Sequence, residues 1–190
     1  MSLRLDLLRH GETTRGGGFR GSIDDALTDT GWAQMREGLP QGQDWQALVS
    51  SPLQRCAAFA REQAERLTLP LHLEPGLQEL HFGDWEGQTA LQLMASAEKE
   101  LGLFWNDPYA FTPPRGETLL AFEARVLAAL ARVQQRHAGQ HVLLVTHGGV
   151  MRLLLARARG LPREQLMQVE VGHGAAFSLQ VADDLSLQEC

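Results

Sequence analysis

Two histidines occupy matching positions, each at the end of a segment that we predict to be a buried strand. A Leu-rich run at residues 3–8 leads to His10, and the clearest buried-strand pattern of the chain, at residues 141–146, leads to His147. Open α/β sheets bind ligands beyond the carboxyl ends of their strands, so we expect both imidazoles at one site. Each histidine alone has an ordinary alternative as a surface or hydrogen-bonded core residue, but the matching positions favour a shared chemical role.

Two arginines are expected beside these histidines. Arg9 immediately precedes the first of them. Arg55 lies in the first turn of a helix that we predict to begin with Ser51 as its cap and Pro52 as its first residue. This helix ends near Leu67, and the amide groups at its start favour anions. Guanidinium groups repel a metal ion but bind phosphate oxygens, so the four side chains together indicate a phosphate site.

A metal site is the alternative. Suitable ligand types are available at His10, Glu12, Asp24, Asp25, His81 and His147. Their spacing matches none of the patterns typical of zinc or calcium sites, and Cys56 and Cys190 are too far apart in the sequence to resemble a metal-binding pair. We therefore predict that the protein needs no metal and no other cofactor.

An alternation of strands and helices must position these residues. We predict strands at 3–8, 47–50, 71–73, 141–146 and 175–181. We predict helices from a cap at Thr28 to Met35, from Ser51 to Leu67, over 117–136, over 150–158 and from Pro162 onward. This order is typical of an α/β fold with a mostly parallel sheet and helices on both faces. We expect residues 1–190 to form one domain, with a small cap at 88–114.

The composition is that of an ordinary globular chain. The 190 residues are 44% hydrophobic and 21% charged, and 17 Lys and Arg against 23 Asp and Glu give a net charge of -6. This charge disfavours a nucleic-acid partner. Charges at Arg4 and Asp6 interrupt the first apolar segment, and no apolar run has the length of a membrane span, so we expect neither export nor membrane insertion. Two isolated cysteines fit a cytoplasmic setting. The predicted phosphate site implies a small molecule that carries phosphate as the partner.

Four segments together resemble the histidine phosphatase superfamily, also called phosphoglycerate-mutase-like proteins. They are Leu-Arg-His-Gly-Glu-Thr at 8–13, Ser-Pro-Leu-Gln-Arg at 51–55, Leu-Gln-Glu-Leu-His-Phe-Gly-Asp-Trp-Glu-Gly at 77–87 and Val-Thr-His-Gly-Gly at 145–149. The resemblance extends from near residue 3 to near residue 180 and implies the phosphoglycerate-mutase-like fold. The stretch 19–31 looks particularly like the α-ribazole phosphatase branch of this family.

The resemblance implies a role for each of the main candidate residues. His10 would be the nucleophile that takes the phosphoryl group, Glu79 the proton donor and His147 the third catalytic residue. Arg9 and Arg55 would surround the phosphate oxygens together with His147, which we expect to be protonated beside them. Weaker expectations are phosphate contacts from Thr13, Thr14 and Gly148, and substrate contacts from Arg20 and His81. Many family members carry an Asn shortly after Arg-His-Gly, and its absence here leaves the phosphate contacts of this loop open.

The function that the resemblance implies is that of a metal-independent phosphomonoesterase. It would work through a phosphohistidine and hydrolyse α-ribazole 5'-phosphate in the assembly of the cobalamin nucleotide loop. We expect the apolar base of this substrate to pack against Phe19, Phe82, Trp85 and Phe104.

Three alternatives to this function are kept. A broad-specificity phosphatase is one, and a phosphoglycerate-type mutase is another, although a mutase generally wants a longer closing segment than residues 88–114. Outside enzymes, the chain could be a non-catalytic module that binds phosphorylated ligands. Glu79 argues against this module, because a binder needs no general acid.

Overall fold

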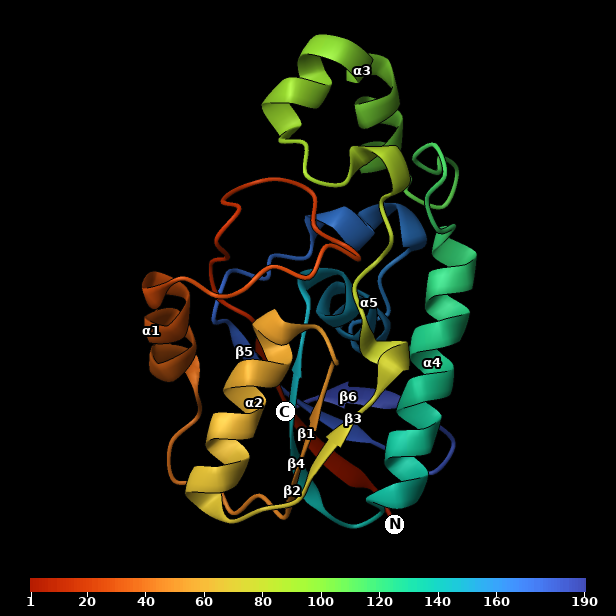
Figure 1. The fold of residues 1–190 in the computed structure, drawn as a ribbon. Helices are drawn as coiled ribbons and strands as arrows, with labels where there is room; N and C mark the ends of the chain where they lie inside the picture. The colour runs from red at the N-terminus through yellow and green to blue at the C-terminus, as the bar shows by residue number, and fades with distance from the viewer.

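A six-stranded mixed sheet occupies the centre of the computed structural model, which describes residues 1–190 (Figure 1). The strands lie in the order β3-β2-β4-β1-β5-β6. Their bounds are Leu3–Arg9 for β1, Ala47–Ser50 for β2, Leu71–Leu73 for β3, His141–Thr146 for β4, Ala176–Val181 for β5 and Leu187–Glu189 for β6. The first four strands in this order run parallel, whereas β5 pairs antiparallel with β1 and β6 antiparallel with β5. The predicted α/β fold with a mostly parallel sheet is confirmed, and β6 is the one strand that the sequence pattern missed.

Alternating side chains of the central strands supply two separate apolar cores. In β1, Leu5 and Leu7 face one core and Leu8 faces the other. In β4, Leu144 belongs to the first core and Leu143 to the second. Because both faces of these strands are buried among apolar side chains, their sequences are nearly continuous hydrophobic runs rather than alternating ones.

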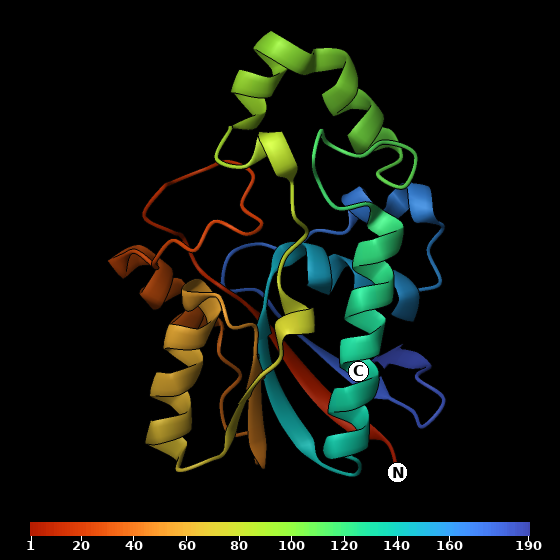
Figure 2. The ribbon, with the colours of Figure 1, turned by 45° about the vertical axis from the view of Figure 1, so that its right-hand side comes forward.

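Two pairs of helices cover the two faces of the sheet (Figures 1 and 2). Their bounds are Asp29–Gly38 for α1, Gln54–Leu67 for α2, Leu119–Arg136 for α4 and Gly148–Ala158 for α5. α1 and α2 bury Met35 and Phe59 against one face, whereas α4 and α5 bury Phe122 and Leu154 against the other. The predicted covering of both faces is therefore confirmed.

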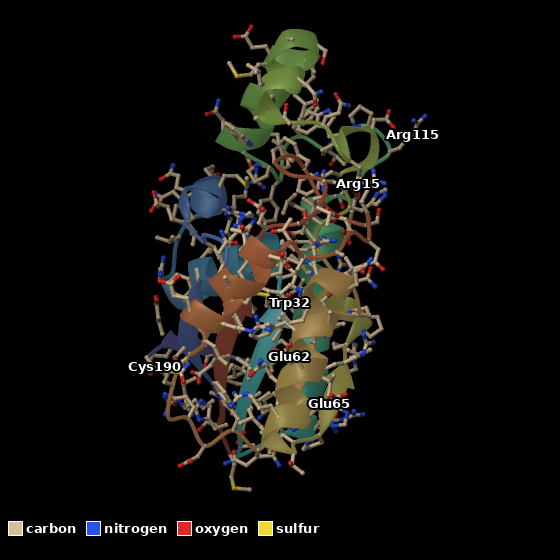
Figure 3. The ribbon with its side chains drawn as sticks, turned by 60° about the vertical axis from the view of Figure 1, so that its left-hand side comes forward. Arg15, Trp32, Glu62, Glu65, Arg115 and Cys190 are labelled. Carbon is tan, nitrogen blue, oxygen red and sulfur yellow. The ribbon has the colours of Figure 1, made fainter.

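The outer side of α1 and α2 combines one aromatic contact with charged residues (Figure 3). Trp32 of α1 packs on Phe59 of α2, with ring centroids 5.7 Å apart. Glu62 and Glu65 lie on the outer side of α2, and Arg36 of α1 donates a hydrogen bond of 3.1 Å to Glu62. An exposed ion pair of this kind contributes little stability, so the aromatic contact and the buried faces hold the two helices together.

The predicted cap of α1 is correct, whereas the predicted starts of α2, α4 and α5 differ from the observed ones by two residues. Thr28 caps α1 as predicted, and its hydroxyl accepts the Gly31 amide at 3.0 Å. α2 begins at Gln54, two residues later than predicted, because Leu53 is still extended. The Gln54 amide donates at 2.7 Å to the carboxylate of Asp24, which lies 30 residues earlier in the chain. Such a cap cannot be read from the local sequence.

The predicted cap contains the helix α3 (Ala90–Asn106), which stands apart from the sheet beyond the carboxyl ends of β1 and β4 (Figures 1 and 2). Thr89 caps α3 through a reciprocal hydrogen-bonded contact with Gln92, and the backbone leaves the helical conformation at Ala97. Trp105, near the end of α3, is 46% exposed. The cap therefore faces the end of the sheet where the two histidines were expected.

The last helical segment is shorter and tighter than the α-helices. It is a 3-10 helix at Arg163–Gln168, and Pro162 directly precedes it, close to the predicted start. Among all the helices of the structure, none combines the length and the apolar character that crossing a membrane requires.

Candidate active site

The strand register brings the two predicted histidines together. Arg9 at the end of β1 pairs with Thr146 at the end of β4, and the His10 amide donates to the Thr146 carbonyl oxygen at 3.1 Å. A histidine follows each of these strand ends, and the centroids of the His10 and His147 rings lie 5.3 Å apart. The two imidazoles therefore share one site at the carboxyl ends of parallel strands.

The His10 ring is held in one tautomer and in its neutral form. Its Nδ1 lies 2.8 Å from the Gly11 carbonyl oxygen, which can only accept, so Nδ1 carries the proton and Nε2 keeps its lone pair. Burial lowers the pKa of His10 to about 3, and the charges of Arg9 and Arg55 add to this effect. A neutral imidazole with a free Nε2 can act as a nucleophile at neutral pH.

His147 lies in a more enclosed environment than His10. It is completely buried, and its Nε2 lies 2.7 Å from the Ser51 hydroxyl oxygen. Burial, followed by the charge of Arg55, lowers the pKa of His147 well below its usual value. Burial and the neighbouring arginines disfavour another positive charge here, and a protonated His147 beside a bound phosphate remains a prediction.

Arg9 is charged and faces the space beside His10. Its Nη1 donates to the Val171 carbonyl oxygen at 2.5 Å, while its Nε is buried without a protein partner. Burial lowers the pKa of Arg9 to about 10, and the charge of Arg152 contributes to this decrease. The group keeps its proton at neutral pH and retains donors for an anion.

Arg55 is completely buried and bound to the loop that precedes α1. Its Nη1 donates to the Ile23 carbonyl oxygen at 2.6 Å, and its Nη2 donates to the Gly21 carbonyl oxygen at 2.8 Å. The carboxylate of Asp25 lies 3.8 Å from Nη1. Its charge acts on both histidines. The two bonds use two of the five N–H groups of the guanidinium, and Nε is buried without a protein partner.

Glu79 lies beside the same space, on the loop between β3 and α3. Its Oε1 accepts the Leu80 amide at 2.9 Å, and its Oε2 accepts the Gly149 amide at 2.9 Å. Arg125 of α4 donates to the Glu79 carbonyl oxygen at 3.2 Å. Because side chain and backbone are both held, the carboxyl group has the fixed position that acid–base catalysis needs.

Arg9, His10 and Glu79 line a cavity of about 540 Å³, a size that suits a small ligand, whereas the completely buried Arg55 and His147 do not line it. Its lining residues are Arg9, His10, Thr13, Gly16, Gly17, Gly18, Phe19, Arg20, Glu79, Phe82, Trp105, Arg152, Met167, Gln168 and His173. Another cavity, of about 480 Å³, lies beside β3 around His72 and His137 and has neither His10 nor Glu79 in its wall. We therefore place the candidate active site in the first cavity.

Arg20 lines this cavity but is bound to its own loop. Its Nε donates to Asp25 at 3.2 Å, and its Nη2 donates to the carbonyl oxygens of Arg15 and Gly16 at 2.9 and 3.1 Å. Thr13 also lines the cavity. Burial raises the pKa of Asp25, but hydrogen bonds from Thr13 and Arg20 outweigh this effect and lower it. Many family members carry an Asn in this glycine-rich segment. Here, hydrogen bonds from Arg20 to the carbonyl oxygens of Arg15 and Gly16 hold the segment in place.

Three of the weaker expected residues lie outside the cavity wall. Thr14 and His81 are exposed and do not line it. Thr13 turns inward, whereas Thr14 begins the turn that follows and faces solvent. Gly148 does not line the cavity either, but a Cβ on it would lie only 3.1 Å from the Nε of Arg9. This glycine allows the guanidinium group to lie against the start of α5.

The side chains that were considered for a metal site make separate contacts. The Glu12 carboxylate accepts a hydrogen bond from the Thr28 hydroxyl at 2.8 Å, and the Asp24 carboxylate accepts one from the Gln54 amide at 2.7 Å. The Asp25 carboxylate accepts a hydrogen bond from Arg20. These carboxylates hold the loops around the cavity in place. Independence from metal ions remains a prediction for activity measurements to test.

Arg152, Trp105 and His173 line the cavity although sequence analysis did not select them as site residues. Arg152 lies one helical turn after Gly148, and this spacing of four residues is the signal that could have identified it. The His173 ring centroid lies 5.8 Å from that of His10, and burial lowers the pKa of His173. Trp105 reaches the cavity from the cap helix, and no local pattern distinguishes it from an ordinary surface tryptophan.

The aromatic part of the cavity wall differs from the predicted one. Phe19 and Phe82 line the cavity as expected, with ring centroids 5.0 Å apart. Trp85 and Phe104 are wrong as lining residues, because they are core residues that are 3% and 1% exposed. They pack against Phe19 at centroid distances of 5.6 and 6.5 Å. Trp105 lines the cavity instead, since successive helical side chains point about 100° apart.

Comparisons with known proteins identify the family. The sequence model of the histidine phosphatase superfamily (branch 1) matches residues 5–186. The adenosylcobalamin/alpha-ribazole phosphatase of Escherichia coli (strain K12) is 33% identical over 183 residues, covering 94% of this chain and 90% of that protein. The glucosyl-3-phosphoglycerate phosphatase of Mycolicibacterium vanbaalenii is 34% identical over 191 residues, covering 94% and 84% respectively.

A solved structure agrees with the sequence matches. The alpha-ribazole phosphatase from Shigella flexneri superposes with a TM-score of 0.83 at 31% identity, and the match covers 98% of this chain and 94% of that one. The family match spans nearly the whole chain, and the histidines of the Arg-His-Gly and Thr-His-Gly motifs meet at the carboxyl ends of β1 and β4. The chain therefore belongs to branch 1 of the histidine phosphatase superfamily and is a phosphatase of that family.

Proposed function

We propose that this phosphatase hydrolyses α-ribazole 5'-phosphate to α-ribazole and phosphate in the assembly of the cobalamin nucleotide loop. The observation that carries the proposal is the composition of the cavity wall. His10 and Arg9 supply a nucleophile and a cation, while Phe19, Phe82 and Trp105 supply aromatic surface. A phosphate monoester with a planar apolar base matches both parts. The relatives in Escherichia coli and Shigella flexneri, which carry alpha-ribazole phosphatase names, support this choice.

In the first step, the lone pair on Nε2 of His10 attacks the phosphorus atom in line with the ester oxygen. The N–P bond forms and the P–O ester bond breaks, so its electron pair passes to the leaving oxygen. That oxygen takes a proton from Glu79, whose carboxyl group is fixed by the amides of Leu80 and Gly149. The phosphate dianion entering beside the carboxylate favours the protonated acid that this step needs.

In the second step, water attacks the phosphorus atom of the phosphohistidine. The proton of the attacking water passes to the Glu79 carboxylate, and the electron pair of the N–P bond returns to Nε2 of His10. Arg9 donates to the phosphate oxygens. Arg55 adds its positive charge beside both histidines, and the contact with the Ser51 hydroxyl holds the ring of His147 in place. The enzyme is regenerated with one water consumed for each phosphate released.

A phosphoglycerate ester is the second candidate substrate, and the Mycolicibacterium vanbaalenii relative favours it. Its carboxylate requires an additional cation in the cavity, and Arg20 is one of the arginines in the wall. Arg20 already donates to Asp25 and to two carbonyl oxygens of its own loop. This commitment makes Arg20 a poor partner for a second anionic group, so the additional cation would have to be Arg152 of the same cavity wall.

Three other expectations belong to the same proposal. The reaction needs no metal ion or other cofactor, because the arginines and Glu79 supply the charge stabilisation and the proton. Residues 1–190 act as one histidine phosphatase domain. The enzyme works in the cytoplasm on a small molecule, and the free thiol of Cys56 is consistent with that compartment.

The test is a comparison of kcat/KM for α-ribazole 5'-phosphate, 3-phosphoglycerate and a simple sugar phosphate. We expect the ribazole ester to have the highest value, and Trp105→Ala to lower it by about three- to tenfold because an aromatic contact is lost. The sugar phosphate should change little in the same variant. A preference for 3-phosphoglycerate that disappears in Arg20→Ala would contradict the proposal, and equal values for all three esters would indicate a broad phosphatase.

A further inference from the structure

His173 is a residue of the cavity wall that has no part in the reaction described above. It lies in the loop before β5, whereas His10 directly follows β1. Both residues line the cavity, and the centroids of their rings lie 5.8 Å apart. The two imidazoles therefore border the same space, in which Nε2 of His10 would form its bond to phosphorus.

The loop that carries His173 is tied to Arg9 on both sides of this histidine. Nη1 of Arg9 donates to the Val171 carbonyl oxygen at 2.5 Å, and the Arg9 amide donates to the Ala175 carbonyl oxygen at 3.0 Å. Within the loop, the Ala175 amide donates to the Gly172 carbonyl oxygen at 3.1 Å and closes a turn. The backbone of His173 is thus fixed relative to the arginine that is proposed to bind the phosphate oxygens.

α1 supports the same loop through two close backbone contacts. Gly174 has a φ of +70°, a conformation that favours glycine. A Cβ on Gly174 would lie 2.4 Å from the Gln34 carbonyl oxygen, and a Cβ on Gly38 would lie 1.7 Å from the Gly174 carbonyl oxygen. Contacts of the backbone with β1 and α1 therefore set the position of His173, and its ring is not needed for this.

The ring of His173 is available to a ligand. Neither ring nitrogen has a hydrogen-bond partner in the protein, and the residue keeps contact with solvent. Burial and the charge of Arg9 lower the pKa of His173, while the charge of Glu12 acts in the opposite direction. The neutral ring has one N–H group and the cation has two, so the ring can donate a hydrogen bond in either form.

We propose that His173 is a further substrate-binding residue, whose ring donates a hydrogen bond to an oxygen of the phosphoryl group at His10. Phosphoryl oxygens carry negative charge before and during transfer, so such a bond is charge-assisted and stabilises the group throughout. The inference rests on the proposed reaction at His10. It adds a donor from outside the four segments that resemble the family, since residue 173 lies in none of them.

Inorganic phosphate and orthovanadate are the probes for this contact, because neither carries a leaving group. His173→Phe keeps an aromatic ring but removes its N–H groups. It should raise the inhibition constants of both anions by about 10- to 100-fold, since a hydrogen bond to a charged group is lost. The matched control is His72→Phe in the cavity beside β3, which has neither His10 nor Glu79 in its wall. The control should be inhibited like the wild type.

Two amide variants and thermal unfolding separate a ligand contact from a structural role. His173→Gln places an N–H group near the position of Nε2, and His173→Asn places one near Nδ1. One of them should recover most of the anion affinity and identify the donating nitrogen. Without anions, His173→Phe should have the Tm of the wild type, because the ring has no protein partner. Added phosphate should raise the Tm of the wild type more than that of this variant.

Three results would overturn the proposal. One is a set of anion inhibition constants in His173→Phe within about twofold of the wild-type values, a change too small for a lost contact. Another is a loss confined to kcat/KM of esters, since His173 would then contact the leaving group. The third is a lowered Tm without recovery in either amide variant, which would indicate a structural role.

Failure of the proposed function is distinguishable from these results. A wild type without preference for α-ribazole 5'-phosphate, or without a phosphohistidine, would contradict the function. The comparison of anion inhibition constants between His173→Phe and the wild type would still stand, because it uses neither the ribazole ester nor the covalent intermediate.

Discussion

The Glu79 carboxylate accepts the Gly149 amide at 2.9 Å, which ties the proposed proton donor to the first turn of the helix that follows His147. The other carboxylate oxygen accepts the Leu80 amide at the same distance of 2.9 Å. The position of the acid therefore depends on the helix that begins directly after β4, and not only on its own loop. The proposed nucleophile His10, the second histidine His147 and the proposed acid Glu79 are thus all held at the same end of the sheet.

Gly149→Ala should displace this acid. A Cβ on Gly149 would lie 2.2 Å from Oε1 of Glu79, so the carboxyl group must move. We expect kcat/KM for alkyl phosphates to fall by about 100-fold, within the range that general acid catalysis contributes, while the phosphate Kd stays unchanged. Gly102→Ala is the control, because a Cβ there meets no atom within 4 Å. Normal alkyl phosphatase activity in Gly149→Ala would show that the acid tolerates a shift or lies elsewhere.

Glu79→Gln should slow alkyl esters much more than aryl esters such as p-nitrophenyl phosphate. An alkoxide needs a proton to leave, so the expected loss is about 100-fold or more for alkyl esters and much smaller for the aryl ester. With the aryl ester, phosphoenzyme should accumulate and produce a burst of nitrophenol, because the second step lacks its base. Equal losses for both esters without a burst would move the acid role to Asp84 or Glu86 on the same loop.

His10→Ala should abolish turnover, and the wild type should form an acid-labile, base-stable phosphoryl adduct that the variant lacks. Rapid quenching with labelled substrate measures the adduct. Most of the activity surviving in His10→Ala would exclude His10 as the nucleophile.

The buried neutral His10 should also make stability depend on pH. The imidazole of the unfolded chain binds a proton below about pH 6.5, whereas the folded protein keeps the pKa of His10 at about 3. The unfolded state therefore binds more protons in this window, and the free energy of unfolding falls as the pH falls from 6.5 toward 3. His10→Gln should make this dependence shallower by up to about 1.4 kcal/mol per pH unit, measured by urea unfolding at pH 7, 6 and 5. An unchanged slope would mean that His10 is not held neutral.

Arg55→Lys should reduce stability as well as activity. Lysine cannot reproduce the two hydrogen bonds to the carbonyl oxygens of Gly21 and Ile23, which are worth about 1.5–3 kcal/mol each when a charged donor is involved. We expect a clear decrease in the denaturation midpoint and a lower kcat. Arg61→Lys, an exposed position on the same helix, is the matched control. A variant with full stability and activity would contradict the assigned support of the loop.

Activity should persist in EDTA and be inhibited by orthovanadate, which imitates the five-coordinate phosphorus between His10 and the arginines. The measurement is the rate of phosphate release before and after chelation, with and without added divalent ions. Loss of activity on chelation that a divalent ion restores would favour a metal-dependent reaction instead.

The sequence by itself determined which residues lie at the ends of the central strands. The runs at 3–8 and 141–146 are apolar enough to be buried on both faces, and such strands must end where the polar residues begin. His10 and His147 therefore had to meet once the strands paired in parallel. The Thr28 cap was also predictable, because its partner amide lies three residues away.

Only the tertiary structure decided which side chains face the ligand. Asp24, 30 residues upstream of Gln54, sets the start of α2. The loop at residues 21–25 accepts one hydrogen bond from each terminal nitrogen of Arg55. The carbonyl group of Val169, 17 residues away, orients Arg152, and the cap helix brings Trp105 to the cavity. Local patterns specify strands and helices because these depend on neighbours in the chain. The hydrogen-bond partner and burial of a long polar side chain depend on distant segments, which the fold alone brings together.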